Sequence, residues 1–121
     1  ARSIQRFFAS DLAKRIFSAE QVHRELRFLA VLGEEELSLW RDDIRGEDTT
    51  TVQGVADCVF IEDGQAVIVD YKTDWVESGE ELAHRYRPQL ELYRMILEKS
   101  MGVRVKECIL YSLRLGEEIR I

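Results

Sequence analysis

The sequence predicts an α/β fold in which a mixed sheet is flanked by helices, and three observations lead to this prediction. Apolar residues recur at helical spacing in an early segment, residues 3–17, and in a late one, residues 78–101. Two apolar stretches between these segments are joined by an Asp-Gly pair, the strongest short-range signal of a β-hairpin. A last apolar stretch follows the late helix, so the predicted order is helix, three mostly antiparallel strands, helix and strand.

The length and composition favour one domain without a membrane span. The chain has 121 residues, which is enough for one hydrophobic core and too few for two, so we expect a single domain over residues 1–121. No apolar run approaches the roughly 20 residues of a membrane-spanning helix, and the first residues lack the pattern of a secretory signal. We therefore expect a cytoplasmic protein. The formal net charge of −6 argues against binding nucleic acid by overall attraction, so any polyanion would be held locally.

The first elements follow from the spacing of apolar residues. Residues 3–17 carry apolar side chains at helical spacing with charged residues between them, which predicts an amphipathic helix with a break near Ser10. Residues 22–32 are richer in strand formers and are predicted to form a strand that stops at Gly33. Residues 34–51 are acidic and polar, which is typical of a solvated loop or a protruding hairpin.

The next two apolar stretches, VQGVADCVFI and QAVIVDYK, form the predicted hairpin. With Asp63 and Gly64 as the two turn residues, Glu62 faces Gln65, and each further pair keeps the same sum of residue numbers. Apolar residues occupy both faces of the two strands. The hairpin is therefore expected to lie inside the sheet and to be covered on both sides.

The late helix is predicted to begin at Ser78 or Gly79 and to end near Gly102. Pro88 lies inside this segment, where a proline either kinks the helix or opens a second one. Residues 103–113, VRVKECILYSL, are predicted to be the last strand. Reaching it from the hairpin through a helix predicts a right-handed parallel crossover.

The hairpin register brings three ionisable residues together. Asp57 falls directly opposite Asp70, so their side chains share one face of the sheet. Lys72 lies two positions beyond Asp70 and points to the same side. Two facing carboxylates beside a core repel each other, so the pair would hold a proton or need a cation. Lys72 offsets one charge, and the remaining oxygens suit a hard divalent cation such as Mg²⁺.

Tyr71 stands between Asp70 and Lys72 on the same strand, and its backbone carbonyl is a candidate for a further oxygen ligand of the cation. The alternative is structural: Asp70 and Lys72 form an ion pair at a strand end, and Asp57 caps a turn. A register slip of one residue would separate the carboxylates and remove the case for a metal.

The two cysteines, Cys58 and Cys108, stand 50 positions apart in strand-like surroundings. This spacing favours buried reduced thiols over a zinc site or an iron–sulfur cluster, which need close pairs.

A cation held by two carboxylates beside an amine is suited to metal-assisted hydrolysis of a phosphodiester. The metal would bind the scissile phosphate and lower the pKa of a bound water. Lys72 would orient that water or neutralise the charge that develops on the phosphoryl oxygens.

Three motifs in order, GVADCVF, VIVDYKTD and YRPQLELY, carry a family resemblance. Their Gly-x-x-Asp, Asp-Tyr-Lys-Thr and Tyr-x-x-Gln-x-x-x-Tyr patterns resemble the nuclease domain of AddA/RecB-type ATP-dependent helicase-nucleases, a branch of the PD-(D/E)XK nuclease superfamily. The likeness extends from FFASDLAKRIFSA to ILYSLRLGEEIRI, nearly the whole chain. It implies a restriction-endonuclease-like PD-(D/E)XK core with a mixed central sheet flanked by helices.

The resemblance also implies roles for individual residues. Asp57 and Asp70 would bind Mg²⁺, with Mn²⁺ as a substitute, and the carbonyl of Tyr71 would join them. Lys72 would be the catalytic lysine. Gln89 matches the helix motif behind the site, where it would orient DNA or the active-site strand; alternatively it is an ordinary helix surface residue.

Other residues of the motifs keep structural interpretations. Tyr86 and Tyr93 are expected to be core aromatics, since tyrosine usually buries its ring. Glu25 matches an acidic position of the family, and an ordinary surface salt bridge is an equal alternative. Both histidines, His23 and His84, are expected on the surface. The candidate phosphate contacts are Arg85, Arg87, Arg94, Lys14, Arg15 and Arg27.

The family's metal site also uses a histidine from a helix upstream of this sequence. By the resemblance, the chain is a C-terminal piece of a larger helicase-nuclease, and alone it would be weak or inactive. The expected partners are single-stranded DNA, the helicase part of the same chain and a second nuclease-helicase subunit.

The expected function is that of a Mg²⁺-dependent exonuclease module in recombinational repair of double-strand breaks. The alternative is a non-catalytic interaction or scaffolding domain that retains the nuclease fold, and a third hypothesis is a standalone nuclease with another substrate preference.

Overall fold

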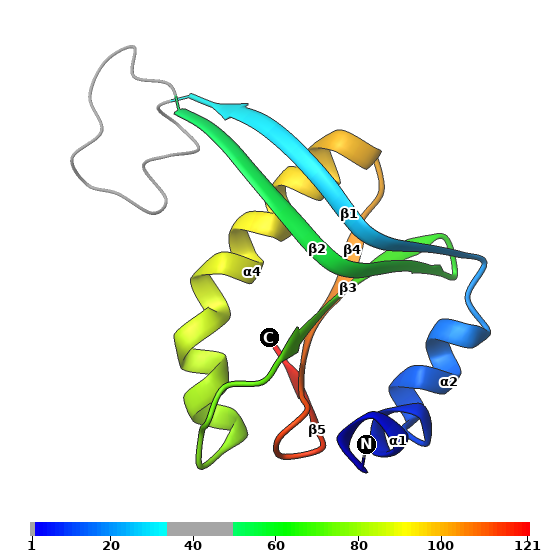
Figure 1. Cartoon of the computed structure of the whole chain (residues 1–121). Coiled ribbons are helices and arrows are strands. Elements are labelled where there is room, and N and C mark those ends of the chain that lie inside the picture. The colour runs from blue at the N-terminus through cyan, green and yellow to red at the C-terminus, as the bar shows by residue number, and fades with distance from the viewer. Residues whose placement is uncertain (1, 34–49) are drawn as a thin grey trace.

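The computed structural model describes residues 2–33 and 50–121 and has a five-stranded sheet with helices on both faces (Figure 1). The strands lie side by side in chain order: β1 (Gln21–Leu32), β2 (Thr50–Glu62), β3 (Gln65–Lys72), β4 (Val105–Ser112) and β5 (Glu117–Arg120). All neighbours are antiparallel except β3 and β4, which are parallel. The predicted mixed α/β sheet is therefore confirmed.

Helix α4 (Gly79–Met101) covers one face of the sheet, and the short helices α1 (Arg2–Phe8) and α2 (Asp11–Phe17) cover the other (Figure 1). The predicted break between the early helices is confirmed. Ser10 has an extended backbone, and its Oγ accepts a 3.2 Å hydrogen bond from the N–H of Ala13, so it caps α2.

Each face of the sheet has its own hydrophobic core. The cluster under α4 contains Val59, Ile61 and Ile68 from the hairpin, and the cluster under α1 and α2 contains Cys58, Phe60, Val67 and Val69. The strands of the hairpin therefore alternate between two buried faces, as expected for an interior pair.

The turn of the hairpin sets the register of β2 and β3. Asp63 and Gly64 have φ angles of +55° and +73°, the positive values that a two-residue turn of this kind requires. Glu62 pairs with Gln65, and the ladder continues in that register to the pair of Cys58 and Val69. The predicted turn and register are confirmed.

Two predictions about the C-terminal half need correction or completion. α4 runs unbroken from Gly79 to Met101 with Pro88 inside it, so the proline does not open a second helix. β5 was not predicted; it folds back onto β4 after a tight turn that contains Gly116, whose φ is +68°. Most of the acidic stretch predicted as a loop or hairpin, residues 34–49, lies outside the described residues.

The ends of α4 match the expected signals. Ser78 Oγ accepts a 3.3 Å hydrogen bond from the N–H of Glu81 at the first turn, and Gly102 ends the helix with a φ of +66°. None of the helices in the described ranges combines the length and apolar character needed to cross a bilayer.

Candidate active site

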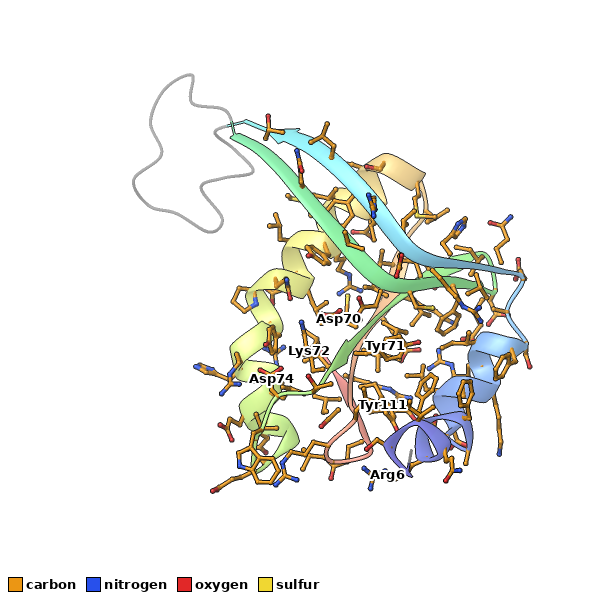
Figure 2. All side chains as sticks on the ribbon, viewed as in Figure 1. Arg6, Asp70, Tyr71, Lys72, Asp74 and Tyr111 are labelled. Atoms are coloured by element: carbon orange, nitrogen blue, oxygen red, sulfur yellow. The ribbon has the colours of Figure 1, made fainter. Side chains whose placement is uncertain are left out.

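Asp57, Asp70 and Lys72 lie close together near the end of the hairpin strands. The Nζ of Lys72 is 2.8 Å from Oδ2 of Asp70, and the carboxyl group of Asp70 is also hydrogen-bonded to that of Asp57. Asp70 and Lys72 lie between β3 and α4 (Figure 2). Only 5% of Asp70 is exposed, so this cluster sits at the margin of the core under α4.

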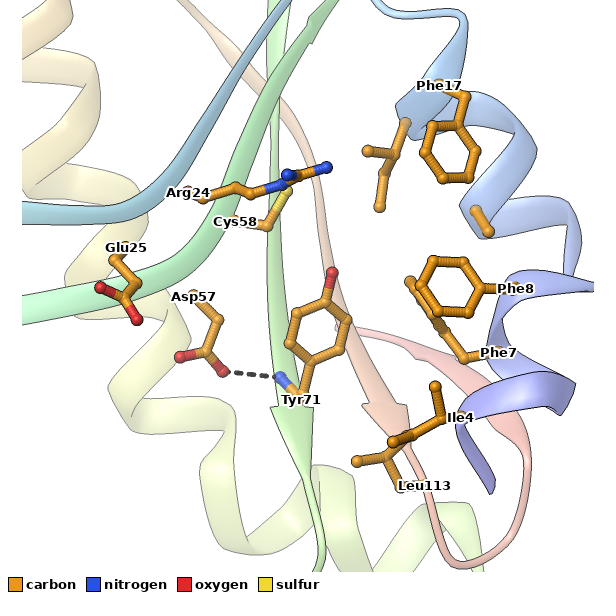
Figure 3. Close-up of a pocket in the computed structure, with 12 residues that line it drawn as sticks. Ile4, Phe7, Phe8, Phe17, Arg24, Glu25, Asp57, Cys58, Tyr71 and Leu113 are labelled. Atoms are coloured by element: carbon orange, nitrogen blue, oxygen red, sulfur yellow. Dashed lines mark hydrogen bonds between the residues drawn. The ribbon is translucent and has the colours of Figure 1, made fainter. Parts of the chain in front are cut away.

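The hairpin register explains why the two carboxylates meet. The ladder ends with Cys58 opposite Val69, and the next residue on each strand is an aspartate. At this point the N–H of Tyr71 donates a 2.9 Å hydrogen bond to Oδ2 of Asp57, drawn in Figure 3. The side chain of Asp57 is thus fixed by the backbone of the neighbouring strand.

The cluster of Asp57, Asp70 and Lys72 contains two carboxyl groups and only one ammonium group. Burial and the hydrogen bond with Asp57 raise the pKa of Asp70 to about 6, while Lys72 acts in the opposite direction. Burial lowers the pKa of Lys72, but the hydrogen bond to Asp70 and the charges of Asp70, Tyr86 and Asp57 together outweigh burial and hold the pKa above its ordinary value. Lys72 therefore stays protonated at neutral pH, and one ammonium group serves two carboxyl groups.

An aromatic ring supports Lys72 from α4. Its Nζ lies 3.9 Å from the centroid of the Tyr86 ring, which is a cation–π contact. The hydroxyl of Tyr86 donates a 2.7 Å hydrogen bond to Asp74, and Arg85 pairs with the same carboxylate at 2.7 Å. These two bonds lower the pKa of Asp74.

Tyr86 was expected to be a core aromatic, and its half-buried side chain does pack against the core under α4. Its contact with the proposed catalytic lysine was not predicted, and Asp74 was not singled out from the sequence. The alternation of Asp70, Lys72 and Asp74 was a signal that could have identified Asp74.

Glu25 lies beside this cluster on β1. Its neighbours Arg24 and Leu26 pair with Cys58 and Ala56, so Glu25 faces Asp57. The φ of Glu25 is +51°, a backbone conformation that non-glycine residues seldom adopt. Figure 3 shows the Glu25 and Asp57 carboxylates next to each other. The regular alternation of side chains along β2 also breaks here, because Ala56 and Val59 both join the core under α4.

Gln89 lies on α4 one turn beyond Tyr86. Its Nε2 donates a 3.3 Å hydrogen bond to the hydroxyl of Tyr93, whose ring packs edge-on against Phe28 with the centroids 4.8 Å apart. In the described part of the chain, Oε1 of Gln89 is buried without a hydrogen-bond partner. Gln89 is therefore half-buried against the sheet rather than an ordinary surface residue.

The donor set fits a hard divalent cation. Asp57 and Asp70 offer carboxylate oxygens held within hydrogen-bonding distance of each other, a contact that costs free energy unless a proton or a cation lies between them. Within residues 2–33 and 50–121, no three His, Cys, Asp or Glu side chains gather closely enough to form a closed metal site. Two carboxylates match the way Mg²⁺ is often bound, with water and substrate phosphate completing its shell.

The burial of the two histidines and the two cysteines confirms some predictions and corrects one. His84 is exposed as expected, whereas His23 is half-buried with its Nε2 enclosed, so the surface assignment of His23 is wrong. Cys58 and Cys108 are free and buried as predicted, and burial raises the pKa of Cys108 to about 11. Both thiols are therefore poor nucleophiles.

An apolar cavity of about 540 Å³ adjoins the cluster on the other face of the sheet (Figure 3). Phe7, Phe8 and Phe17 line it from α1 and α2, and the ring of Tyr71 meets Phe7 edge-on with the centroids 5.2 Å apart. Asp57 lines the edge of the cavity. Tyr71 therefore turns its ring to the cavity while its backbone N–H binds Asp57.

Comparisons with known proteins place the fold and the motifs in context. Residues 2–118 match the model of the PD-(D/E)XK nuclease superfamily, which confirms the resemblance seen in the sequence. The crystal structure of the protein SSO0001 is similar, with a TM-score of 0.51 and 19% identity, over 88% of this chain and 42% of that one. This likeness supports the fold alone.

Two relatives carry names that identify each of them as one subunit of an ATP-dependent helicase/nuclease. The protein from Clostridium perfringens strain 13 is 39% identical over 125 residues, which is 98% of this chain and 10% of the relative. The protein from Oceanobacillus iheyensis is 35% identical over 117 residues, 91% of this chain and 9% of the relative. The chain thus spans about a tenth of the length of these relatives.

Proposed function

The chain belongs to the PD-(D/E)XK nuclease superfamily, and on that premise we propose that it is a metal-dependent deoxyribonuclease domain that hydrolyses phosphodiester bonds. The observation that carries this proposal is the hydrogen-bonded pair of Asp57 and Asp70 with Lys72 beside it. A structural ion pair would need one carboxylate, whereas the second carboxylate of this cluster lowers stability. Such costly charge pairs are concentrated at functional sites.

Asp57 and Asp70 would hold Mg²⁺, with Mn²⁺ as a substitute, and the carbonyl of Tyr71 is proposed as a third protein oxygen. The bound cation would supply Lewis-acid activation of water and charge stabilisation at the phosphate. The hydrogen bond from Tyr71 N–H keeps Asp57 oriented toward Asp70, so the two acids are placed before any ligand arrives.

Lys72 has the properties of a charge-stabilising group rather than a base. Its raised pKa keeps the ammonium protonated at neutral pH, so it donates hydrogen bonds and offers positive charge to developing phosphoryl oxygens. The contacts with Asp70 and the ring of Tyr86 fix the position of its Nζ. We assign it the role of the catalytic lysine.

Gln89 is proposed to orient a water or a DNA group near the cluster. Its buried Oε1 is an acceptor without a partner in the described residues, and leaving such an atom unbonded costs roughly 1–3 kcal/mol. A ligand that donates to this atom would recover that free energy.

The names of the relatives extend the proposal to the whole protein. We propose that the domain is an exonuclease module of an ATP-dependent helicase-nuclease in the cytoplasm that acts in recombinational repair of double-strand breaks. Its partners would be single-stranded DNA, the helicase part of the same polypeptide and a second nuclease-helicase subunit.

The test is degradation of end-labelled single-stranded DNA by the chain, and by a longer form with the sequence that precedes it, in EDTA, Mg²⁺ or Mn²⁺. Cutting is expected only with metal, and Asp70→Asn and Lys72→Ala are expected to reduce its rate by about 10²–10³-fold or more. Lys99→Ala is the matched control, because Lys99 is exposed in the last turn of α4 and is not among the candidate phosphate contacts.

Undiminished cutting by Asp70→Asn or Lys72→Ala would refute the assignment of the site. If neither form of the protein cuts DNA with any metal, the scaffolding role becomes the better account of this domain.

A further inference from the structure

Trp75 is the most exposed large apolar side chain in the described residues, with 78% of its surface accessible. Exposing an indole forgoes the free energy of burying it, which amounts to several kcal/mol for a large aromatic group. The neighbouring Val76 is 2% exposed and belongs to the core under α4. The segment is thus anchored in the core while its tryptophan faces solvent.

Arg114 completes a flat platform with this indole. Its guanidinium carbon lies 3.1 Å from the centroid of the Trp75 ring, so the two planar groups are in stacking contact. Arg114 is exposed, and the high accessibility of Trp75 shows that the second face of its ring stays open.

Two chain segments connect the platform of Trp75 and Arg114 to the proposed catalytic lysine, Lys72. Trp75 follows Lys72 by three residues, and Arg114 directly follows Leu113, whose N–H donates a 2.9 Å hydrogen bond to the carbonyl of Lys72. The stacked pair is therefore within about three residues, or roughly 10 Å of extended chain, of Lys72.

Several contacts hold both halves of the platform in place. On one side, Tyr86 and Arg85 bind Asp74, which precedes Trp75. On the other, a guanidinium nitrogen of Arg6 donates to the carbonyls of Leu113 and Arg114, at 2.9 and 3.1 Å. A surface aromatic held in this way loses little conformational entropy when a ligand stacks on it.

Some other arginines of the chain are engaged with carboxylates. Arg85 pairs with Asp74, and Arg15 pairs with Glu62 and Glu107. Arg114 instead rests on an uncharged ring, so its positive charge is available to an anion. An exposed aromatic face next to such a guanidinium is the arrangement that binds single-stranded nucleic acid, because bases stack on the ring and phosphates pair with the cation.

We infer that Trp75 and Arg114 bind the single-stranded DNA next to the scissile phosphate: a base stacks on the open face of Trp75 and a backbone phosphate pairs with Arg114. This inference rests on the proposed nuclease function. It assigns a position for the DNA strand relative to Lys72 and gives a chain with a net charge of −6 a local site for DNA.

Trp75 itself provides the readout. The chain has two tryptophans, so Trp40→Phe leaves Trp75 as the single indole fluorophore. Titration of this variant with oligothymidylate in EDTA, which prevents cutting, is expected to quench its fluorescence to saturation as the bases stack. Titration with an oligophosphate of matched charge and without bases is expected to leave the emission nearly unchanged.

Binding of fluorescein-labelled oligothymidylate, measured by anisotropy, tests the two residues separately in the otherwise native chain. Trp75→Ala is expected to weaken binding about 5- to 150-fold, the effect of losing about 1–3 kcal/mol of stacking. Arg114→Ala is expected to weaken binding and to lower the slope of log affinity against log salt by about 0.7. Phe17→Ala is the matched control, because Phe17 is 66% exposed on α2, and it is expected to bind like the unmodified chain.

The outcomes separate this inference from the proposed function. Absence of quenching, or unchanged affinity of folded Trp75→Ala, overturns the platform even if the chain cuts DNA with metal. Stacking on Trp75 without metal-dependent cutting by any form of the protein supports the platform and counts against the nuclease proposal. Circular dichroism of each variant verifies that the fold is retained.

Discussion

The backbone N–H of Tyr71 donates a 2.9 Å hydrogen bond to Oδ2 of Asp57, so one strand of the hairpin orients the acidic side chain of the other. The same hairpin places Asp70 against Asp57 and, two residues later, Lys72 against Asp70. Charge repulsion between the acids is thus imposed by the register of a tight turn. The cluster exists before a ligand arrives, which is the condition for a pre-organised site.

The ring of Tyr86, rather than its hydroxyl, is expected to position Lys72. The Nζ of Lys72 lies 3.9 Å from the ring centroid, while the hydroxyl contacts Asp74. Tyr86→Phe should keep the single-turnover cutting rate within about threefold of the unmodified chain, whereas Tyr86→Leu should lower it by about 2- to 30-fold, the effect of losing a contact of about 0.5–2 kcal/mol. Equal losses in both variants would show that the bond to Asp74 matters instead.

Glu62 is expected to stabilise the fold at neutral pH and to lose this effect in acid. Hydrogen bonds from Arg15 and then Lys106 lower its pKa from 4.5 to about 2, at N–O distances of 2.9 and 2.7 Å. Because the folded pKa is the lower one, the stabilisation is complete above about pH 4.5 and disappears as the pH falls toward 2.

Urea unfolding of Glu62→Gln tests this pH dependence. The variant should be less stable than the unmodified chain by about 1 kcal/mol at pH 7, a value discounted for solvent screening, and the difference should shrink steadily between pH 4.5 and 2. Asp63→Asn, at a side chain that is 88% exposed in the same turn, is the control and should show little difference at any pH. A deficit in Glu62→Gln that does not change with pH would contradict the assignment.

We expect that Gly54 is needed because a larger residue would not fit at this position, and not because it takes part in catalysis. A Cβ at this position would overlap the ring of Phe28, which in turn packs edge-on against Tyr93. Gly54→Ala should lower the free energy of unfolding by about 1–3 kcal/mol, and adding Phe28→Leu should recover part of that loss. Val55→Ala, at an exposed neighbour, should change stability far less. Simple additivity of the Gly54 and Phe28 substitutions would rule out the overlap as the cause.

Much of the fold could be predicted because local signals agreed with one another. The Asp63-Gly64 turn, the break at Ser10 and the stop at Gly102 each depend on a few neighbouring residues. The unbroken helix at Pro88 and the short strand β5 were harder to predict from the sequence, because both depend on packing between elements. A helix packed along the sheet tolerates the lost hydrogen bond of an interior proline, and β5 has only four residues to pair with β4.

In the candidate site, only the residues whose positions follow from the strand register could be predicted from the sequence. Counting residues from the turn brings Asp57, Asp70 and Lys72 to one face, and the structure places them together. The positions of Tyr86, Glu25 and Trp75 relative to this cluster could not be predicted in that way. Tyr86 approaches Lys72 through the docking of α4, Glu25 through an unusual backbone angle, and Trp75 meets Arg114 through the turn between β4 and β5.

The most direct test of the central claim, that Asp57 and Asp70 together hold a divalent cation, is a Mn²⁺ titration followed by electron paramagnetic resonance. We expect that the chain binds Mn²⁺, that Mg²⁺ competes for the same site, and that Asp57→Asn and Asp70→Asn each weaken binding by at least about tenfold. Binding of Mn²⁺ by both variants as tightly as by the unmodified chain would contradict this claim.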